Sequence, residues 1–214
     1  MSTRKIDSKV IGLFFILPML FYGIGNSLVE PIFTLKKSFS VPSGFQFGGL
    51  LMIANSITVI CIGILLYPKI KKHHKSLAIT YLVTRLIEAL LLIVGIISIF
   101  SLIPLGQRFV ESELDFIEFQ KFSTFAFGVN YYSYQISMLF LGVGSVPFCY
   151  LMYKEKFIPR YLALSGCLGY VLLFAGSISE FLGYNVGIFF SIPGGLFELS
   201  FGLWLIIKGF QTSD

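Results

Sequence analysis

Six long apolar runs, separated by charged or Pro/Gly-rich breaks, constrain this chain more than any other feature of its sequence. The hydrocarbon core of a bilayer is about 30 Å thick, so a helix that crosses it needs about 20 apolar residues. Backbone groups in lipid must be paired within the segment, and the runs lack the strict alternation of barrel strands, so each run is predicted to be a helix. The predicted spans cover about residues 10–32, 45–67, 77–103, 131–153, 162–182 and 186–207.

These runs predict an all-α integral membrane protein in which residues 1–214 form a single transmembrane domain, a bundle of six transmembrane helices. The composition excludes a soluble enzyme. Only 13% of the 214 residues are charged and 56% are hydrophobic, whereas a soluble domain carries roughly 25% charged residues. A chain of this size with so few charges could not cover its surface with polar groups. The lipid bilayer is therefore its predicted partner.

The basic residues predict which helix ends face the cytoplasm, because Lys and Arg stay preferentially on that side. With the N-terminus inside, the cytoplasmic set is Arg4, Lys5, Lys9, Lys69, Lys71, Lys72, Lys75, Lys154, Lys156, Arg160 and Lys208. The outside set is Lys36, Lys37, Arg108 and Lys121. This eleven-to-four distribution predicts that both termini are cytoplasmic. Because the net charge of +5 comes from residues that lie mostly between spans, no nucleic-acid partner is predicted.

The longest connection, about residues 104–130, lies outside in this topology and interleaves acidic with aromatic side chains. Its acids are Glu111, Glu113, Asp115 and Glu118. The pattern is typical of an amphipathic segment that rests on the membrane surface, with its aromatic rings among the headgroups and its acids in water. The alternative is a lid over an outward-facing cavity.

Three charged residues fall near the middle of predicted spans, where an ionised side chain needs a partner inside the bundle. Arg85 and Glu88 lie three residues apart, on one face of the third span. At 1.5 Å per residue, Arg85 is about 12 Å from the cytoplasmic start of its span and Glu198 about 14 Å from the cytoplasmic end of the sixth. If these spans lie side by side, the Arg85 guanidinium can bridge both carboxylates.

One positive and two negative charges leave a surplus negative charge, which is unfavourable in a medium of low dielectric constant. We therefore expect one of the two carboxyl groups to hold a proton. Two hypotheses follow for the Arg85, Glu88 and Glu198 cluster. It either performs proton or ligand chemistry, or it is a structural clip that holds two helices in register.

Further polar residues suggest a second, outer site. A cavity open to the outside could be lined by Asn26, Glu30, Gln135 and Glu180. A helix break at Pro193, Gly194 and Gly195 would expose backbone groups beside it. The alternative is that these side chains only form hydrogen bonds between helices, each contributing about 0.6 kcal/mol.

No metal site and no cofactor are predicted. His73 and His74 lie within 71–75, where the neighbouring ammonium groups repel a cation. Cys61, Cys149 and Cys167 lie inside apolar runs without a CxxC spacing, which indicates neither a disulfide framework nor a zinc site. The familiar catalytic motifs of hydrolases, metalloproteases and nucleotide-binding enzymes are also absent.

The segments 85–89, 193–198, 202–206 and 208–210 resemble the bacterial multi-spanning membrane proteins known as domain of unknown function 4386. The resemblance covers most of the chain and is most specific in the C-terminal block. It implies a six-helix integral protein of a bacterial cell envelope and implies no activity. The residues that carry it are Arg85, Glu88, Pro193, Gly195 and Glu198.

Three classes of function fit these observations. The leading hypothesis is a multi-pass protein of the bacterial plasma membrane that acts as a small carrier, with a proton or a small molecule as its ligand. An intramembrane enzyme that acts on lipid is the second, and a non-catalytic sensor, immunity or assembly protein is the third. A cavity open to one membrane face favours transport, a cavity open sideways to lipid favours an enzyme, and a sealed core favours the third class.

Overall fold

The computed structural model describes residues 3–33, 39–111, 114–184 and 186–211, and these residues form helices and short connections without a strand. Lys36, Lys37 and Glu113, which entered the sequence predictions, lie outside the described residues. The elements are α1 (Thr3–Val29), the short 3₁₀ helix η1 (Glu30–Phe33), α2 (Phe45–Lys71), α3 (Lys75–Phe100), α4 (Leu102–Val110), α5 (Phe116–Lys154), α6 (Arg160–Phe181) and α7 (Gly187–Ile207).

Within the described residues, six helical stretches are long and apolar enough to cross a membrane, which confirms the predicted fold class at this level. Their outward faces carry exposed apolar side chains instead of charges, for example Leu13, Ile57, Ile97, Leu168 and Leu196. A water-soluble protein rarely exposes so much contiguous apolar surface. The arrangement is that of a multi-pass membrane protein.

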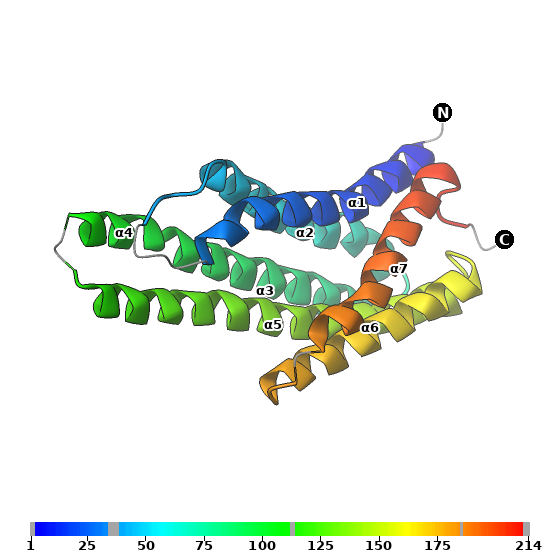
Figure 1. The fold of residues 1–214 in the computed structure, drawn as a ribbon. Helices are drawn as coiled ribbons and strands as arrows, with labels where there is room; N and C mark the ends of the chain where they lie inside the picture. The colour runs from blue at the N-terminus through cyan, green and yellow to red at the C-terminus, as the bar shows by residue number, and fades with distance from the viewer. Residues whose placement is uncertain (1–2, 34–38, 112–113, 185, 212–214) are drawn as a thin grey trace.

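The six long helices form a closed ring in which each packs against two neighbours. The order around the ring is α1, α2, α3, α5, α6 and α7, and α7 packs against α1 to close it. In Figure 1, α3 and α5 run alongside each other, and the first part of α1 lies beside the last part of α7 at one end of the molecule. When short connections join consecutive helices, the chain turns back after each helix, so consecutive helices run antiparallel.

Glycines allow two of these contacts to be very close. A Cβ atom on Gly12 of α1 would lie 2.5 Å from the carbonyl oxygen of Gly202 in α7. A Cβ atom on Gly169 of α6 would lie 2.9 Å from the backbone of Gly194 in α7. Small residues at such positions let helix backbones approach each other in a membrane, where packing replaces the hydrophobic effect as the main attraction between helices. Therefore α7 is held tightly against both of its neighbours.

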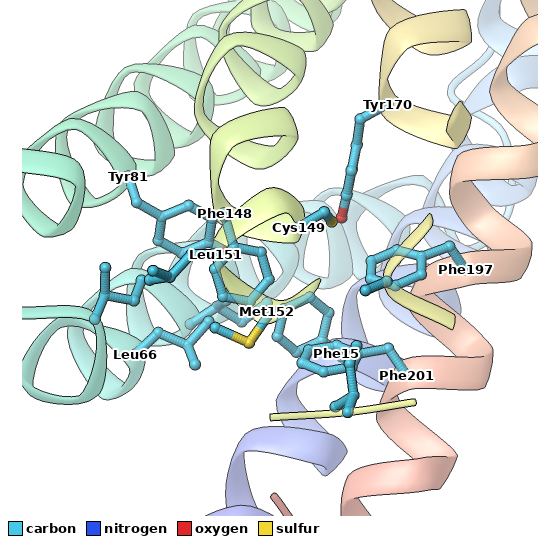
Figure 2. Packing of buried hydrophobic residues seen from close by; sticks show 14 of the residues in the cluster. Phe15, Leu66, Tyr81, Phe148, Cys149, Leu151, Met152, Tyr170, Phe197 and Phe201 are labelled. Atoms are coloured by element: carbon cyan, nitrogen blue, oxygen red, sulfur yellow. The ribbon is translucent and has the colours of Figure 1, made fainter. Parts of the chain in front are cut away.

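The apolar core consists of two separate clusters of buried side chains. The first lies nearer the chain termini and contains Phe15, Phe148 and Phe201, whose packing is shown in Figure 2. The second lies toward α4 and contains Phe45 and Ile99. Along α3, the residues of the first cluster end at Tyr81 and those of the second begin at Ile96. The charged residues Arg85 and Glu88 fall between the two.

The predicted break between an outer segment and the fourth span, at residue 130, does not occur in the structure. Instead, α5 is continuous from Phe116 to Lys154, and α4 takes up much of the remaining outer segment. The Asp115 side chain accepts a hydrogen bond from the backbone N–H of Glu118 at 2.7 Å, so the helix begins there. The Phe109 and Phe119 rings stack at 4.8 Å, and Phe119 is fully buried. Packing against α4 thus incorporates this stretch into the bundle as an extension of α5.

Candidate functional site

A cavity of about 180 Å³ lies inside the ring of helices, and each of the six long helices contributes to its wall. One water molecule needs roughly 10–15 Å³ of such space, so the cavity can hold several waters or a small solute. Polar groups reach it from every side. One polar side chain from each helix, in chain order, is Tyr22, Asn55, Glu88, Tyr134, Tyr170 and Glu198.

Arg85 and Glu88 of α3 form an ion pair at the wall of this cavity. Nη1 of Arg85 donates to both carboxylate oxygens of Glu88, at 3.1 Å and 3.4 Å. Nε of Arg85 donates to the Tyr81 hydroxyl at 3.1 Å, one turn earlier on the same helix. The side chains of Arg85 and Glu88 are only 3% and 4% exposed. A helical spacing of three and four residues places all three groups on one face, so α3 by itself assembles this part of the site.

Glu198 of α7 completes the cluster from the opposite side. Its Oε1 accepts a hydrogen bond from the Tyr170 hydroxyl of α6 at 2.8 Å. The same oxygen lies 3.9 Å from Nη2 of Arg85, at the outer limit of an ion pair. With 18% of its side chain exposed, Glu198 is less enclosed than Glu88. Glu198 is therefore the carboxylate that faces the open space of the cavity.

The contact between Arg85 and Glu198 does not arise from neighbouring helices. The predicted bridge was conditional on the third and sixth spans lying side by side, but α3 and α7 are not neighbours in the ring. Two helices separate them in either direction, so their side chains meet across the interior. The matching depths of Arg85 and Glu198 along their helices allow this contact at 3.9 Å.

One nitrogen of the buried guanidinium remains unsatisfied. Within the described residues, Nη2 of Arg85 is enclosed and has no hydrogen-bond partner. The guanidinium carbon lies 5.2 Å from the Tyr81 ring centre and 5.9 Å from that of Phe15. Aromatic faces attract a cation at such distances, but they do not replace a hydrogen-bond acceptor. Because buried N–H groups are nearly always paired, this nitrogen is an exception within the cluster.

The four residues of the predicted outer cavity do not line this one. The described residues that line the cavity do not include Asn26, Glu30, Gln135 or Glu180. Glu30 is exposed, Asn26 and Glu180 are partly buried, and Gln135 is buried. Glu180 accepts a hydrogen bond from the Tyr131 hydroxyl. Thus Glu180 links α6 to α5, and the outer-cavity hypothesis gains no support from the position of these residues.

The predicted helix break at Pro193, Gly194 and Gly195 is wrong. The α7 helix runs without interruption from Gly187 to Ile207, with Pro193 inside it. A proline inside a helix removes the backbone hydrogen bond of its own nitrogen and crowds the carbonyl group four residues earlier, yet α7 continues through Pro193. Gly194 lies against Gly169 of α6, where it is Gly169 that has no room for a side chain, while Gly195 lines the cavity with open space in front of it. These glycines shape the wall of the site and do not break the helix.

The tyrosines are the functional residues that the sequence reasoning missed. Tyr81 and Tyr170 bind the charged groups directly, and the Tyr22 and Tyr134 rings stack at 5.5 Å at the cavity wall. For Tyr81 a signal was available, because it lies four residues before Arg85 and therefore on the same helical face. The other three come from different helices, and no spacing in the sequence relates them to Glu198.

No group of three or more His, Cys, Asp or Glu side chains within the described residues is placed to hold a metal ion. The two histidines have other contacts. Nδ1 of His73 lies 3.1 Å from a carboxylate oxygen of Glu155. Nδ1 of His74 accepts from the backbone N–H of Leu77 at 3.2 Å and so caps α3.

Residues 10–209 match the family described as Domain of unknown function (DUF4386). The chain belongs to this family. The matched region contains all of the cavity-lining residues, including Arg85, Glu88 and Glu198. No curated protein and no solved structure matches the chain. What the site does must therefore be inferred from its own chemistry.

Proposed function

We propose that this protein is a small carrier of the bacterial plasma membrane that binds a proton or a small solute in the central cavity. The observation that carries this proposal is the position of Glu198, a carboxylate inside the ring of helices that faces open space. Ionisable groups within membrane spans are unfavourable unless they have a partner, and they commonly mark the path of an ion or solute.

The charge balance of the cluster supports a role for the proton. Arg85 offers one positive charge, and Glu88 already occupies its Nη1 atom. Glu198 has the Tyr170 hydroxyl and only a loose contact with Arg85. A second full negative charge would be poorly compensated here, so binding of a proton or another cation by Glu198 balances the site.

A test of this role is proton movement into liposomes that contain the purified protein. Glu198→Gln keeps the shape of the side chain and can still accept a hydrogen bond from Tyr170, but it cannot gain or lose a proton. We expect this variant to unfold at nearly the same temperature as the parent. Its proton flux across a pH gradient, followed with an enclosed pH-sensitive dye, should fall to the level of protein-free liposomes.

The matched control is Glu180→Gln. Glu180 is also a carboxylate in a long helix that accepts a tyrosine hydroxyl, but it lies away from the cavity. This variant should retain full flux. If Glu198→Gln retains full flux as well, the cluster is a structural clip and the carrier proposal is wrong.

We also propose that both termini are cytoplasmic. The proposal rests on the eleven-to-four distribution of basic residues between the two sides. An even number of spans requires the two ends of the bundle to meet on one side, and the beginning of α1 and the end of α7 do lie together (Figure 1).

Cysteine labelling in intact cells tests this orientation. Ser76 and Glu111 are both exposed and lie at opposite ends of the α3 and α4 pair. A membrane-impermeant maleimide should modify Glu111→Cys and spare Ser76→Cys until the cells are opened. The parent protein, whose Cys61, Cys149 and Cys167 lie within the long helices, provides the background. The opposite labelling pattern would invert the topology.

A further inference from the structure

Resting on the proposed carrier function, the geometry points to a more specific solute. We infer that the cavity takes a small organic ammonium ion, whose charged nitrogen binds the Glu198 carboxylate and whose alkyl part lies against the apolar wall.

The two carboxylates of the cluster differ in how many of their binding positions are occupied. Both carboxylate oxygens of Glu88 accept from Arg85, and although this side chain lies at the cavity wall, only 4% of it is exposed. Among the described residues, Glu198 accepts one hydrogen bond, from Tyr170, and it keeps part of its surface open. Glu198 is thus the group that can still bind a ligand. Because its carboxylate is a negatively charged acceptor, it complements an ammonium group.

The charges around the cavity also distinguish between anionic and cationic solutes. A solute with a negative charge would be attracted by Arg85 but would also meet two carboxylates, Glu88 and Glu198, around the same guanidinium. Like charges at such distances oppose binding strongly in a medium of low dielectric constant. The site therefore disfavours anions and favours cations.

The rest of the cavity wall consists of aromatic and apolar side chains that suit an organic cation. The Tyr22 and Tyr134 rings line the cavity, and aromatic faces attract ammonium groups. No described residue forms a hydrogen bond with either hydroxyl. Leu92, Met138 and Leu173 provide an apolar surface for a short alkyl chain.

The test uses three probes of nearly equal size and different charge: propylammonium, 1-propanol and propionate. The melting temperature of the purified protein in neutral detergent is measured as each probe is added at constant ionic strength. We expect propylammonium to raise the melting temperature with saturation, whereas the other two leave it unchanged. Equal shifts with propylammonium and 1-propanol would overturn the inference, because the ligand charge would then be irrelevant.

Two variants assign the effect to the cavity. Glu198→Gln should lose the propylammonium shift completely, and Glu180→Gln should keep it. Gly195→Phe provides a second route, because Gly195 lines the cavity and a Cβ atom there meets nothing within 4 Å, so a bulky side chain would take up cavity space. It should also abolish the shift, while Gly23→Phe, on a helix face that is likewise open, should not. A propylammonium shift that survives both cavity variants overturns the inference.

The liposome assay separates this inference from the carrier proposal. Loss of proton flux in Glu198→Gln together with no propylammonium shift in the parent would retain the carrier and overturn the organic cation. A propylammonium shift that depends on Glu198, together with unchanged flux in Glu198→Gln, would support cation binding and reject transport.

Discussion

Replacing Arg85 with alanine is expected to lower the free energy of unfolding by about 3–5 kcal/mol. The change removes the only described partner of Glu88 and leaves this carboxylate enclosed among side chains. It also removes the donor to the Tyr81 hydroxyl and the guanidinium that packs near the Phe15 ring. The measurement is reversible unfolding in mixed detergent micelles, followed by the loss of helical circular dichroism.

Lys121→Ala is the control for the loss of a positive charge. Lys121 is exposed on α5, so its removal should change the free energy of unfolding by less than about 0.5 kcal/mol. Glu88→Gln should fall between the two, because it keeps the shape of the pair but removes its ionic part. Equal unfolding of the Arg85→Ala and Lys121→Ala proteins would show that Arg85 does not hold a buried pair.

Replacing Gly12 with leucine is expected to destabilise the fold by about 1–3 kcal/mol or more, as overpacking does in other cores. The first carbon of the new side chain would overlap the carbonyl oxygen of Gly202, which belongs to the backbone and cannot rotate away. The contact between α1 and α7 must then widen. Because this contact closes the ring of helices, we also expect the Gly12→Leu protein to lose the propylammonium-dependent rise in melting temperature.

The matched control lies on the same helix. A Cβ atom on Gly23 meets nothing within 4 Å, so Gly23→Leu adds the same side chain to α1 without a clash. It should be neutral or slightly stabilising, because leucine favours a helix more than glycine does. If Gly12→Leu is as stable as Gly23→Leu, the close approach of α1 and α7 is not required for folding.

Much of the architecture could be predicted from the sequence, because a bilayer leaves the backbone few choices. The length and apolar character of the runs predict six helices, and the structure contains six such helices in its described residues. The pairing of Arg85 with Glu88 could be predicted as well, since a separation of three residues on a helix brings the two side chains together wherever that helix lies. Both results depend on local geometry.

The limits of the sequence appear at Pro193 and in the outer segment. Proline and two glycines are a common signature of a helix break, yet α7 continues through them, with Gly194 against α6 and Gly195 at the cavity. Likewise, residues 116–130 have the composition of a surface segment, but contacts such as Phe109 with Phe119 make them part of α5. In both cases packing between helices outweighs the local preference.

The sequence by itself determined the long apolar helices and the positions of the charged groups along them. Only the tertiary structure decided that these helices form a ring, that α3 and α7 stand apart in it, and that Glu198 and Arg85 meet across the interior. It also decided that Tyr170 binds Glu198 and that open space remains beside this carboxylate. The physical reason is that helix order around a ring and cavity shape depend on side-chain contacts between segments far apart in the chain, which leave no periodic signal within any one segment.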